Sequence, residues 1–180
     1  KVSLLEEKLK LANPSSTLGI AHTRWATHGV PSEKNAHPHK SNERIYIVHN
    51  GIIENHLELK SFLVNQGYQL ISETDSEVIG HLLDYFLSQG SNILDAIYLT
   101  KEKLDGAYAI AVLDIKDDEN IYLARSKSPL LIGKGNNENF AASDPLAIGK
   151  LANEFIFLED DDVAVISKSA VQIYDATKQS

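Results

Sequence analysis

The hydrophobic pattern changes its period near Gly106, and this change constrains the fold of the 180-residue chain more than any other feature. Before that glycine, apolar residues recur every three to four positions, as they do on one face of an amphipathic helix. After it, apolar and polar residues alternate in short runs separated by glycine or polar turns, which is typical of successive strands. Helices followed by a mostly antiparallel strand block predict an α+β fold, with sheets packed on each other or under helices.

The part before Gly106 combines predicted helices with a few strands. In one helix the apolar positions recur at helical spacing, and Thr74 or Asp75 occupies the place of an N-cap. Gly67 follows another helix and is expected to act as its C-terminal cap. The predicted helices cover residues 1–13, 52–67, 72–90 and 92–105, and the predicted strands cover 18–23, 44–50 and 68–72.

The part after Gly106 reads as a succession of short strands. The acidic run at 159–162 lies between two apolar runs, so we interpret it as a solvated hairpin turn. A calcium loop is the alternative, but the run lacks the ligand spacing and the glycine of an EF-hand. The predicted strands cover 107–114, 120–125, 130–135, 139–144, 154–158, 163–167 and 170–175.

Composition excludes several classes of function. The formal net charge of -8 argues against a nucleic-acid partner, because such binding relies on basic residues that neutralise phosphates. No apolar run reaches the roughly 20 residues of a membrane span, and no signal-peptide pattern opens the printed sequence, so we expect no membrane partner. The absence of cysteine rules out disulfides and thiolate metal sites, and a cytoplasmic location is expected.

The length suits one domain covering residues 1–180. The chain contains no methionine, even at position 1, so we predict that the domain is incomplete at its N-terminus. The polar tail at 175–180 is expected to begin an interdomain linker. Gly133 and Gly135 lack the third glycine of a dinucleotide site, and no serine-hydrolase motif occurs, so no cofactor is expected.

The segment GIAHTRWATHGVPSEKNAHPH, residues 19–39, contains four of the seven histidines and the only tryptophan. These histidines suggest a metal site, and His37 and His39 stand close together. However, no His-x-x-x-His lies on a predicted helix, and no Cys/His spacing matches a zinc pattern. We therefore favour histidines that hold the loop in place by hydrogen bonds, and we expect no metal.

Three other features suit the chemistry of a free amino acid. The guanidinium of Arg24 can bind a carboxylate through two charge-assisted hydrogen bonds, and Asp75 can bind an ammonium group. Asn50 followed by Gly51 can present an amide and a backbone N–H to an oxyanion, because glycine permits close approach of the backbone. Taken singly, each has an ordinary explanation: a surface ion pair for Arg24, a turn for Asn-Gly and a helix cap for Asp75.

Together, the motifs are more specific. HTRWATHG, NAHPH, VHNGIIENH, SETDSEVIGHL, LDGAYAIAVLD, ARSKSPLLIG and FAASDPLA occur in this order along the chain. From about residue 19 to its end, the chain resembles the class II glutamine amidotransferases, and in particular the glutaminase domains of the glutamine–fructose-6-phosphate aminotransferase family. Other class II amidotransferases carry different residues after the shared arginine.

This resemblance implies an N-terminal-nucleophile hydrolase fold, a four-layer αββα sandwich, here lacking its N-terminal strands. It implies that Arg24 binds the α-carboxylate of L-glutamine and that Asp75 contacts the α-ammonium. Asn50 and Gly51 are expected to form the oxyanion hole. The resemblance further implies that the pocket is lined by Trp25, Thr27 and His28.

In the family, an N-terminal cysteine attacks the glutamine amide, and the ammonia passes to a sugar-isomerase domain that converts fructose 6-phosphate to glucosamine 6-phosphate. This chain contains no cysteine, so we predict that it is inactive as printed. It is expected to be part of a longer aminotransferase, associated with an isomerase domain of the same polypeptide and homo-oligomeric at full length. The alternative hypothesis is a non-catalytic, glutamine-binding or regulatory module.

Overall fold

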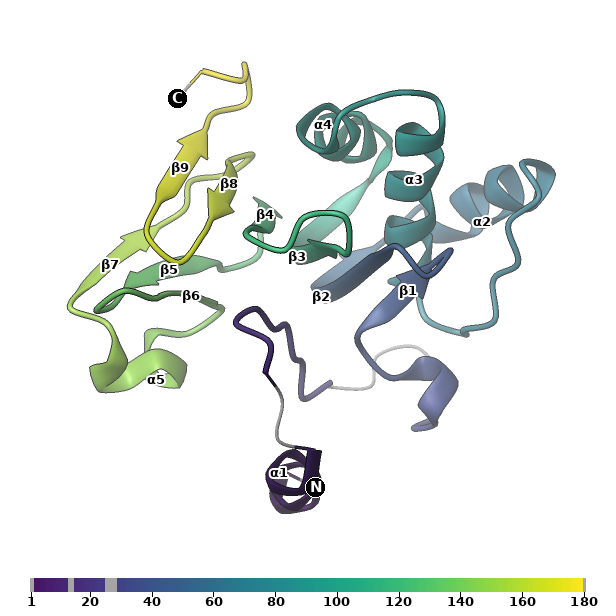
Figure 1. Cartoon of the computed structure of the whole chain (residues 1–180). Coiled ribbons are helices and arrows are strands. Elements are labelled where there is room, and N and C mark those ends of the chain that lie inside the picture. The colour runs from purple at the N-terminus through teal and green to yellow at the C-terminus, as the bar shows by residue number, and fades with distance from the viewer. Residues whose placement is uncertain (1, 13–14, 25–28, 180) are drawn as a thin grey trace.

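The computed structural model of the chain describes residues 2–12, 15–24 and 29–179 (Figure 1). The helices of this part are α1 (Val2–Ala12), α2 (His56–Asn65), α3 (Glu77–Ser88), α4 (Ile93–Lys103) and α5 (Pro145–Ile148), with short 3-10 turns at Glu33–Asn35 and Gly149–Leu151. The strands are β1 (His39–Ser41), β2 (Ile45–Ile53), β3 (Gly106–Asp114), β4 (Ile121–Ser126), β5 (Leu131–Lys134), β6 (Asn139–Ala142), β7 (Glu154–Phe157), β8 (Val163–Ile166) and β9 (Val171–Tyr174).

The strands form two antiparallel sheets. The larger sheet has the order β1-β2-β3-β4-β8-β9, and the smaller has the order β6-β5-β7. The central pair of the larger sheet is β2 with β3, whose register aligns Ile45 with Asp114 and Ile53 with Gly106. Every strand predicted after Gly106 is present, which confirms the period-2 interpretation of that part of the sequence.

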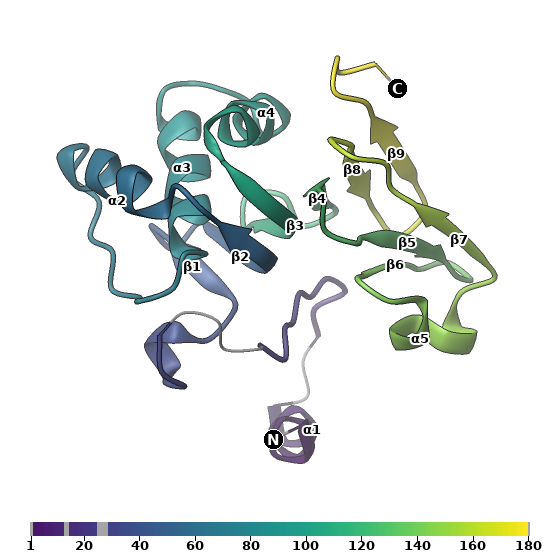
Figure 2. The same ribbon diagram turned by 180° about the vertical axis from the view of Figure 1, so that it is seen from behind.

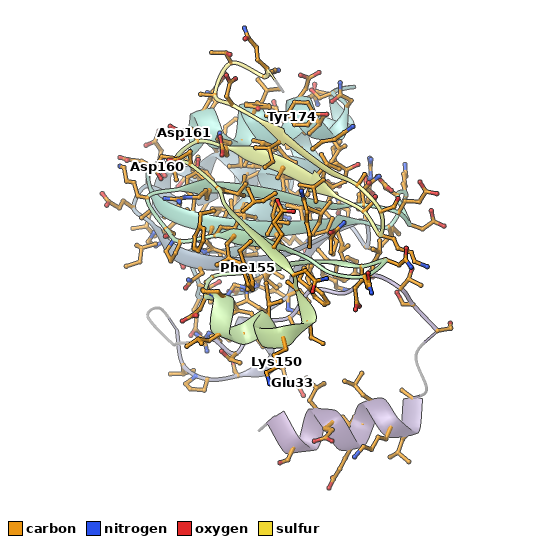
Figure 3. All side chains as sticks on the ribbon, turned by 90° about the vertical axis from the view of Figure 1, so that its left-hand side faces the viewer. Glu33, Lys150, Phe155, Asp160, Asp161 and Tyr174 are labelled. Carbon is orange, nitrogen blue, oxygen red and sulfur yellow. The ribbon has the colours of Figure 1, made fainter. Side chains whose placement is uncertain are left out.

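Alternate residues of the larger sheet face two different layers. On β3, Ile110 and Val112 belong to the core beneath α2, α3 and α4, whereas Ala109 belongs to a second core shared with the smaller sheet. On the far side of the smaller sheet lies α5, and a Cβ on Gly133 would come within 2.9 Å of Ile148 in that helix. In Figure 1, α5 lies on the opposite side of the strands from α2, α3 and α4, and in Figure 3, seen from the side of β7 and β9, it lies below the strands. The predicted α+β fold with four αββα layers is confirmed.

Helix α1 lies apart from the layered body in both ribbon views (Figures 1 and 2). Its prediction from the sequence is confirmed, but Leu5 and Leu9 on its apolar face are about half exposed. In the part of the chain that the structure describes, no helix combines the length and the apolar character that a membrane crossing requires.

Two predicted strands are absent, and in the second of them local groups bind the backbone. Residues 18–23 and 68–72 have no strand partners. The N–H of Tyr68 donates to the carbonyl of Leu63 at the end of α2, beside Gly67 in its predicted capping position, and a carboxylate from α3 accepts the next amides at Ile71 and Ser72. The apolar residues of 68–72 therefore give the hydrophobic pattern of a strand, although the segment does not join a sheet.

The start of α3 also differs from the prediction. Its N-cap is Ser76, rather than Thr74 or Asp75, and no side chain caps the helix through a hydrogen bond. The carboxylate of Asp75 instead accepts the backbone N–H of Ile53 at 2.8 Å. Asp75 therefore fastens the start of the helix to the end of β2.

The acidic run at 159–162 is not a hairpin turn, because β7 belongs to the smaller sheet and β8 to the larger one. The run instead carries the chain from one sheet to the other. Asp160 accepts a hydrogen bond from the Lys127 backbone at 2.8 Å and forms an ion pair with Arg125 at 2.5 Å. Alternation predicted both strands correctly but carried no information about which sheet each would join.

The core under α3 offers a measure of stability. Ile79 is 0% exposed and Ile115, just after β3, is 62% exposed. We expect Ile79→Val to lower the free energy of unfolding by about 0.5–1.5 kcal/mol, because it removes one buried methyl group. Urea denaturation followed by circular dichroism would measure this. The matched variant Ile115→Val should change stability by less than about 0.5 kcal/mol, and equal losses in the two variants would contradict the observed burial.

Candidate functional site

The site begins where β2 passes Gly51. This glycine has a φ of +135° and pairs with Tyr108 on β3. A Cβ at this position would lie 2.0 Å from the carbonyl oxygen of Ala107, so no other residue fits without moving the backbone. The neighbouring Asn50 is exposed. At this point β2 therefore presents the amide side chain of Asn50 next to the backbone of Gly51, which has no side chain.

A second wall comes from the residues that lead into α3. Asp75 is buried and receives the Ile53 amide, as described above. The hydroxyl of Ser76 lies 2.8 Å from Nδ1 of His49, which precedes Asn50 on β2. These bonds tie the end of β2 to the start of α3 and hold the Asp75 carboxylate beside the Asn-Gly pair.

A third wall comes from the segment that ends at Arg24. Its backbone is left-handed, with a φ of +50°, and its N–H donates to Nδ1 of His22 at 2.9 Å. The guanidinium donates to the carbonyl of Gly29 at 2.9 Å and to that of Val30 at 3.4 Å. These bonds direct the guanidinium toward the backbone of residues 29 and 30.

These three walls enclose a cavity of about 260 Å³. Of the seven predicted site residues, it gathers Arg24, Asn50, Gly51 and Asp75. Trp25, Thr27 and His28 lie outside the described residues. The cavity therefore presents a cation and an anion beside an amide and a glycine backbone, which suits a small zwitterion. Its lining residues are His22, Arg24, His37, His49, Asn50, Gly51, Ile52, Thr74, Asp75 and Ser76.

The histidines of the site are held neutral near pH 7. Burial lowers the pKa of His37 to about 3, helped by the neighbouring charges of His39 and His22. Burial also lowers the pKa of His49 to about 4. For His22, burial and then the charge of Arg24 lower the pKa. Because these imidazoles are neutral, Arg24 is the positively charged residue among the described residues that line the cavity.

The sequence did not identify every residue of the cavity. His37 was interpreted only as a loop-holding residue, yet it lines the cavity, with its ring centroid 4.5 Å from that of His22. His49, Thr74 and Ser76 line it as well. Their positions beside Asn50 and Asp75 were the only available signal. Among residues 2–12, 15–24 and 29–179, no group of His, Asp or Glu is arranged to hold a metal ion.

Comparison with known sequences gives a consistent result. The family described as "Glutamine amidotransferase domain" matches residues 22–150. A glutamine–fructose-6-phosphate aminotransferase (isomerizing) from Salmonella typhi is 49% identical over 98% of this chain. A protein of the same name from Haemophilus influenzae is 49% identical over 97%. The chain spans 29% and 28% of the length of these two relatives.

Comparison with solved structures bears on the fold. A glutamine phosphoribosylpyrophosphate amidotransferase from B. subtilis, complexed with ADP and GMP, aligns with a TM-score of 0.71. The alignment covers 88% of this chain and 34% of that one at 24% identity. A class-II glutamine aminotransferase domain protein from Silicibacter pomeroyi aligns with a TM-score of 0.59 at 17% identity, over 76% of this chain and 69% of that one. At these identities, the likeness extends to the fold alone.

Proposed function

Because the chain belongs to the glutamine amidotransferase family, we propose that its cavity binds L-glutamine for hydrolysis of the side-chain amide. The observation that carries this proposal is the presence of Arg24 and Asp75 in one cavity beside Asn50 and Gly51. A free amino acid has both an α-carboxylate and an α-ammonium, and each meets an opposite charge there. A residue inside a peptide lacks both charges, so the pair also provides selectivity.

The cavity residues then have separate roles. Arg24 binds the α-carboxylate and Asp75 the α-ammonium, which fixes the orientation of the substrate. The side-chain N–H of Asn50 and the backbone N–H of Gly51 stabilise the oxyanion that forms when the amide carbon is attacked. Trp25, Thr27 and His28 complete the pocket in this proposal. The attacking group is the thiolate of an N-terminal cysteine, as in the class II glutamine amidotransferases.

The proposal separates binding from turnover. The 180 residues contain no cysteine, so we expect this polypeptide to bind L-glutamine without hydrolysing it. Isothermal titration calorimetry would measure binding, and a coupled glutamate dehydrogenase assay would measure ammonia release. D-Glutamine is the matched control ligand, because it presents the same charges in the wrong arrangement. Ammonia release by the purified chain would contradict the proposed nucleophile, and equal affinity for both enantiomers would contradict the proposed pocket.

The relatives suggest what the ammonia is used for. Both aminotransferases named above are far longer than this chain. We propose that this chain is the glutaminase domain of such an enzyme and that its ammonia aminates fructose 6-phosphate in a sugar-isomerase domain. The test is glucosamine 6-phosphate formation from L-glutamine by the full-length polypeptide. Glutaminase activity without this product would retain the amidotransferase assignment and remove the sugar substrate.

A further inference from the structure

The carboxylate of Glu77 binds the chain that precedes its own helix. One oxygen accepts the backbone N–H of Ile71 at 3.0 Å, and the other accepts that of Ser72 at 2.7 Å. Glu77 is the first residue of α3 and only 4% exposed. An acidic residue in a first helical turn often serves the helix dipole from the solvent side. Here the carboxylate is buried and both oxygens bind a turn that lies upstream.

Glu77 stays ionised in this environment. Burial raises the pKa of a carboxyl group, but the nearby imidazole of His81 and the hydrogen bonds from the two amides outweigh this effect, so the pKa of Glu77 lies below its usual value. A carboxylate presents one acceptor oxygen to each amide, whereas an amide side chain of the same shape presents an oxygen to one and an NH2 donor to the other. The two-point support of the turn therefore depends on the charge.

Hydrogen bonds connect this turn to the cavity. The hydroxyl of Ser72 accepts the N–H of Thr74 at 2.8 Å and lies 2.7 Å from its hydroxyl. The hydroxyl of Thr74 lies 3.1 Å from Nε2 of His39. Thr74 lines the cavity, and Asp75 follows it directly. A chain of hydrogen bonds thus links Glu77, through Ser72, to Thr74 and so to the wall that contains the Asp75 carboxylate.

The other neighbours of Glu77 do not form a second reaction centre. One of its oxygens lies 3.6 Å from Nε2 of His81, whose Nδ1 lies 2.7 Å from the hydroxyl of Ser41. This order imitates a Ser-His-Glu triad. However, Ser41 is 1% exposed, so no substrate reaches its hydroxyl. Ser41 fixes the imidazole of His81, which lies beside the Glu77 carboxylate without a hydrogen bond to it.

We propose that Glu77 is a positioning residue, which sets the place of Asp75 and thereby the selectivity of the cavity for a substrate with a free α-ammonium. The proposal rests on the proposed function, in which Asp75 contacts that ammonium. Glu77 touches neither substrate nor reacting atoms. A change at Glu77 is expected to affect binding of the α-ammonium and not of the α-carboxylate, because the turn that Glu77 supports leads into Asp75 and not into Arg24.

The test compares two ligands on the 180-residue chain by calorimetry. L-Glutamine has the α-ammonium, and 4-carbamoylbutanoate is the same molecule without the α-amino group. The wild-type chain should bind L-glutamine more tightly. In Glu77→Gln, the NH2 group of the new side chain faces one of the two backbone amides of the turn, and two donors cannot form a hydrogen bond. We therefore expect the ratio of the two affinities to fall about tenfold, which corresponds to a loss of roughly 1.4 kcal/mol in ammonium binding. The affinity for 4-carbamoylbutanoate should change little.

Asp114→Asn is the matched control, because Asp114 is also a carboxylate at 4% exposure with two-point binding, to Arg44. Both variants should unfold at lower temperature, but only Glu77→Gln should lower the affinity ratio. Since Glu77→Gln can also prevent folding, Ser72→Ala provides a second test of the same connection, with a smaller loss expected in the same direction.

Suppose that the wild-type chain prefers L-glutamine to 4-carbamoylbutanoate. If Glu77→Gln and Ser72→Ala then leave the ratio of the two affinities unchanged, the role of Glu77 is overturned and the proposed function stands. An equal fall in Asp114→Asn would also overturn the role of Glu77, because a general loss of stability would then explain the effect. A wild-type chain without preference for L-glutamine would overturn the proposed function, and the inference with it.

Discussion

Replacing Arg24 with alanine is expected to weaken L-glutamine binding by roughly 30- to 5000-fold, because truncation of a charged partner in a desolvated pair typically costs about 2–5 kcal/mol. The guanidinium can bind the α-carboxylate with two parallel hydrogen bonds. Arg24→Lys should recover only part of the loss, since an ammonium keeps the charge without the planar fork. Calorimetry on the chain measures the affinity, and the KM for glutamine of the full-length polypeptide should rise in parallel.

Arg24 also donates to the carbonyls of Gly29 and Val30, so its replacement could loosen the loop. The ligand 4-aminobutanamide, which is glutamine without its α-carboxylate, separates the two effects. If Arg24 binds the carboxylate, Arg24→Ala should leave the affinity for 4-aminobutanamide nearly unchanged. An equal loss for both ligands would assign Arg24 a loop-holding role, and a full-length variant with wild-type glutamine affinity would contradict the substrate assignment.

Replacing Asn50 with alanine should act on turnover rather than on binding. If Asn50 has the proposed oxyanion role, we expect kcat of the full-length polypeptide to fall about 100- to 1000-fold with little change in KM, because an oxyanion-hole donor strengthens its bond mainly in the transition state. Steady-state kinetics of glutamate formation would measure both constants. Glycine at position 51 would still supply its backbone N–H, so residual activity is expected.

Asn65 offers a matched control for Asn50. It is an exposed asparagine at the end of α2, away from the cavity lining. Asn65→Ala should leave both kinetic constants unchanged. A rise in KM at constant kcat in Asn50→Ala would instead show that Asn50 contributes uniform substrate binding, and the oxyanion role would have to be withdrawn.

The sequence predicted the elements better than their partners. Alternation identified every strand after Gly106, because a sheet with two covered faces still separates larger from smaller apolar residues, as Ile110 and Ala109 show. It failed at residues 68–72, where an apolar run satisfies its amides through Glu77. It also paired β7 with β8 wrongly, because the choice of sheet depends on contacts distant in sequence, such as Arg125 with Asp160.

The site was predictable where chemistry was concentrated in single residues. Arg24, the Asn50-Gly51 pair and Asp75 stood out because each combines a reactive group with a predicted strand end or helix start, and the structure gathers them in one cavity. His37 and Thr74 were not identified, because lining a cavity depends on the path of the loops. The role of Glu77 depends on hydrogen bonds to the preceding turn, which its place at the start of a helix does not predict.

The close approach of β2 and β3 at Gly51 has a consequence for how this pocket can diversify. A Cβ on Gly51 would meet Ala107 at 2.0 Å, and a Cβ on Gly106 would meet Ile52 at 2.1 Å. That part of the cavity is bare main chain, so it offers no side chain through which successive mutations could alter ligand preference. A change of ligand preference would have to come from the segments that flank this floor, because the floor itself has no room for a side chain at Gly51.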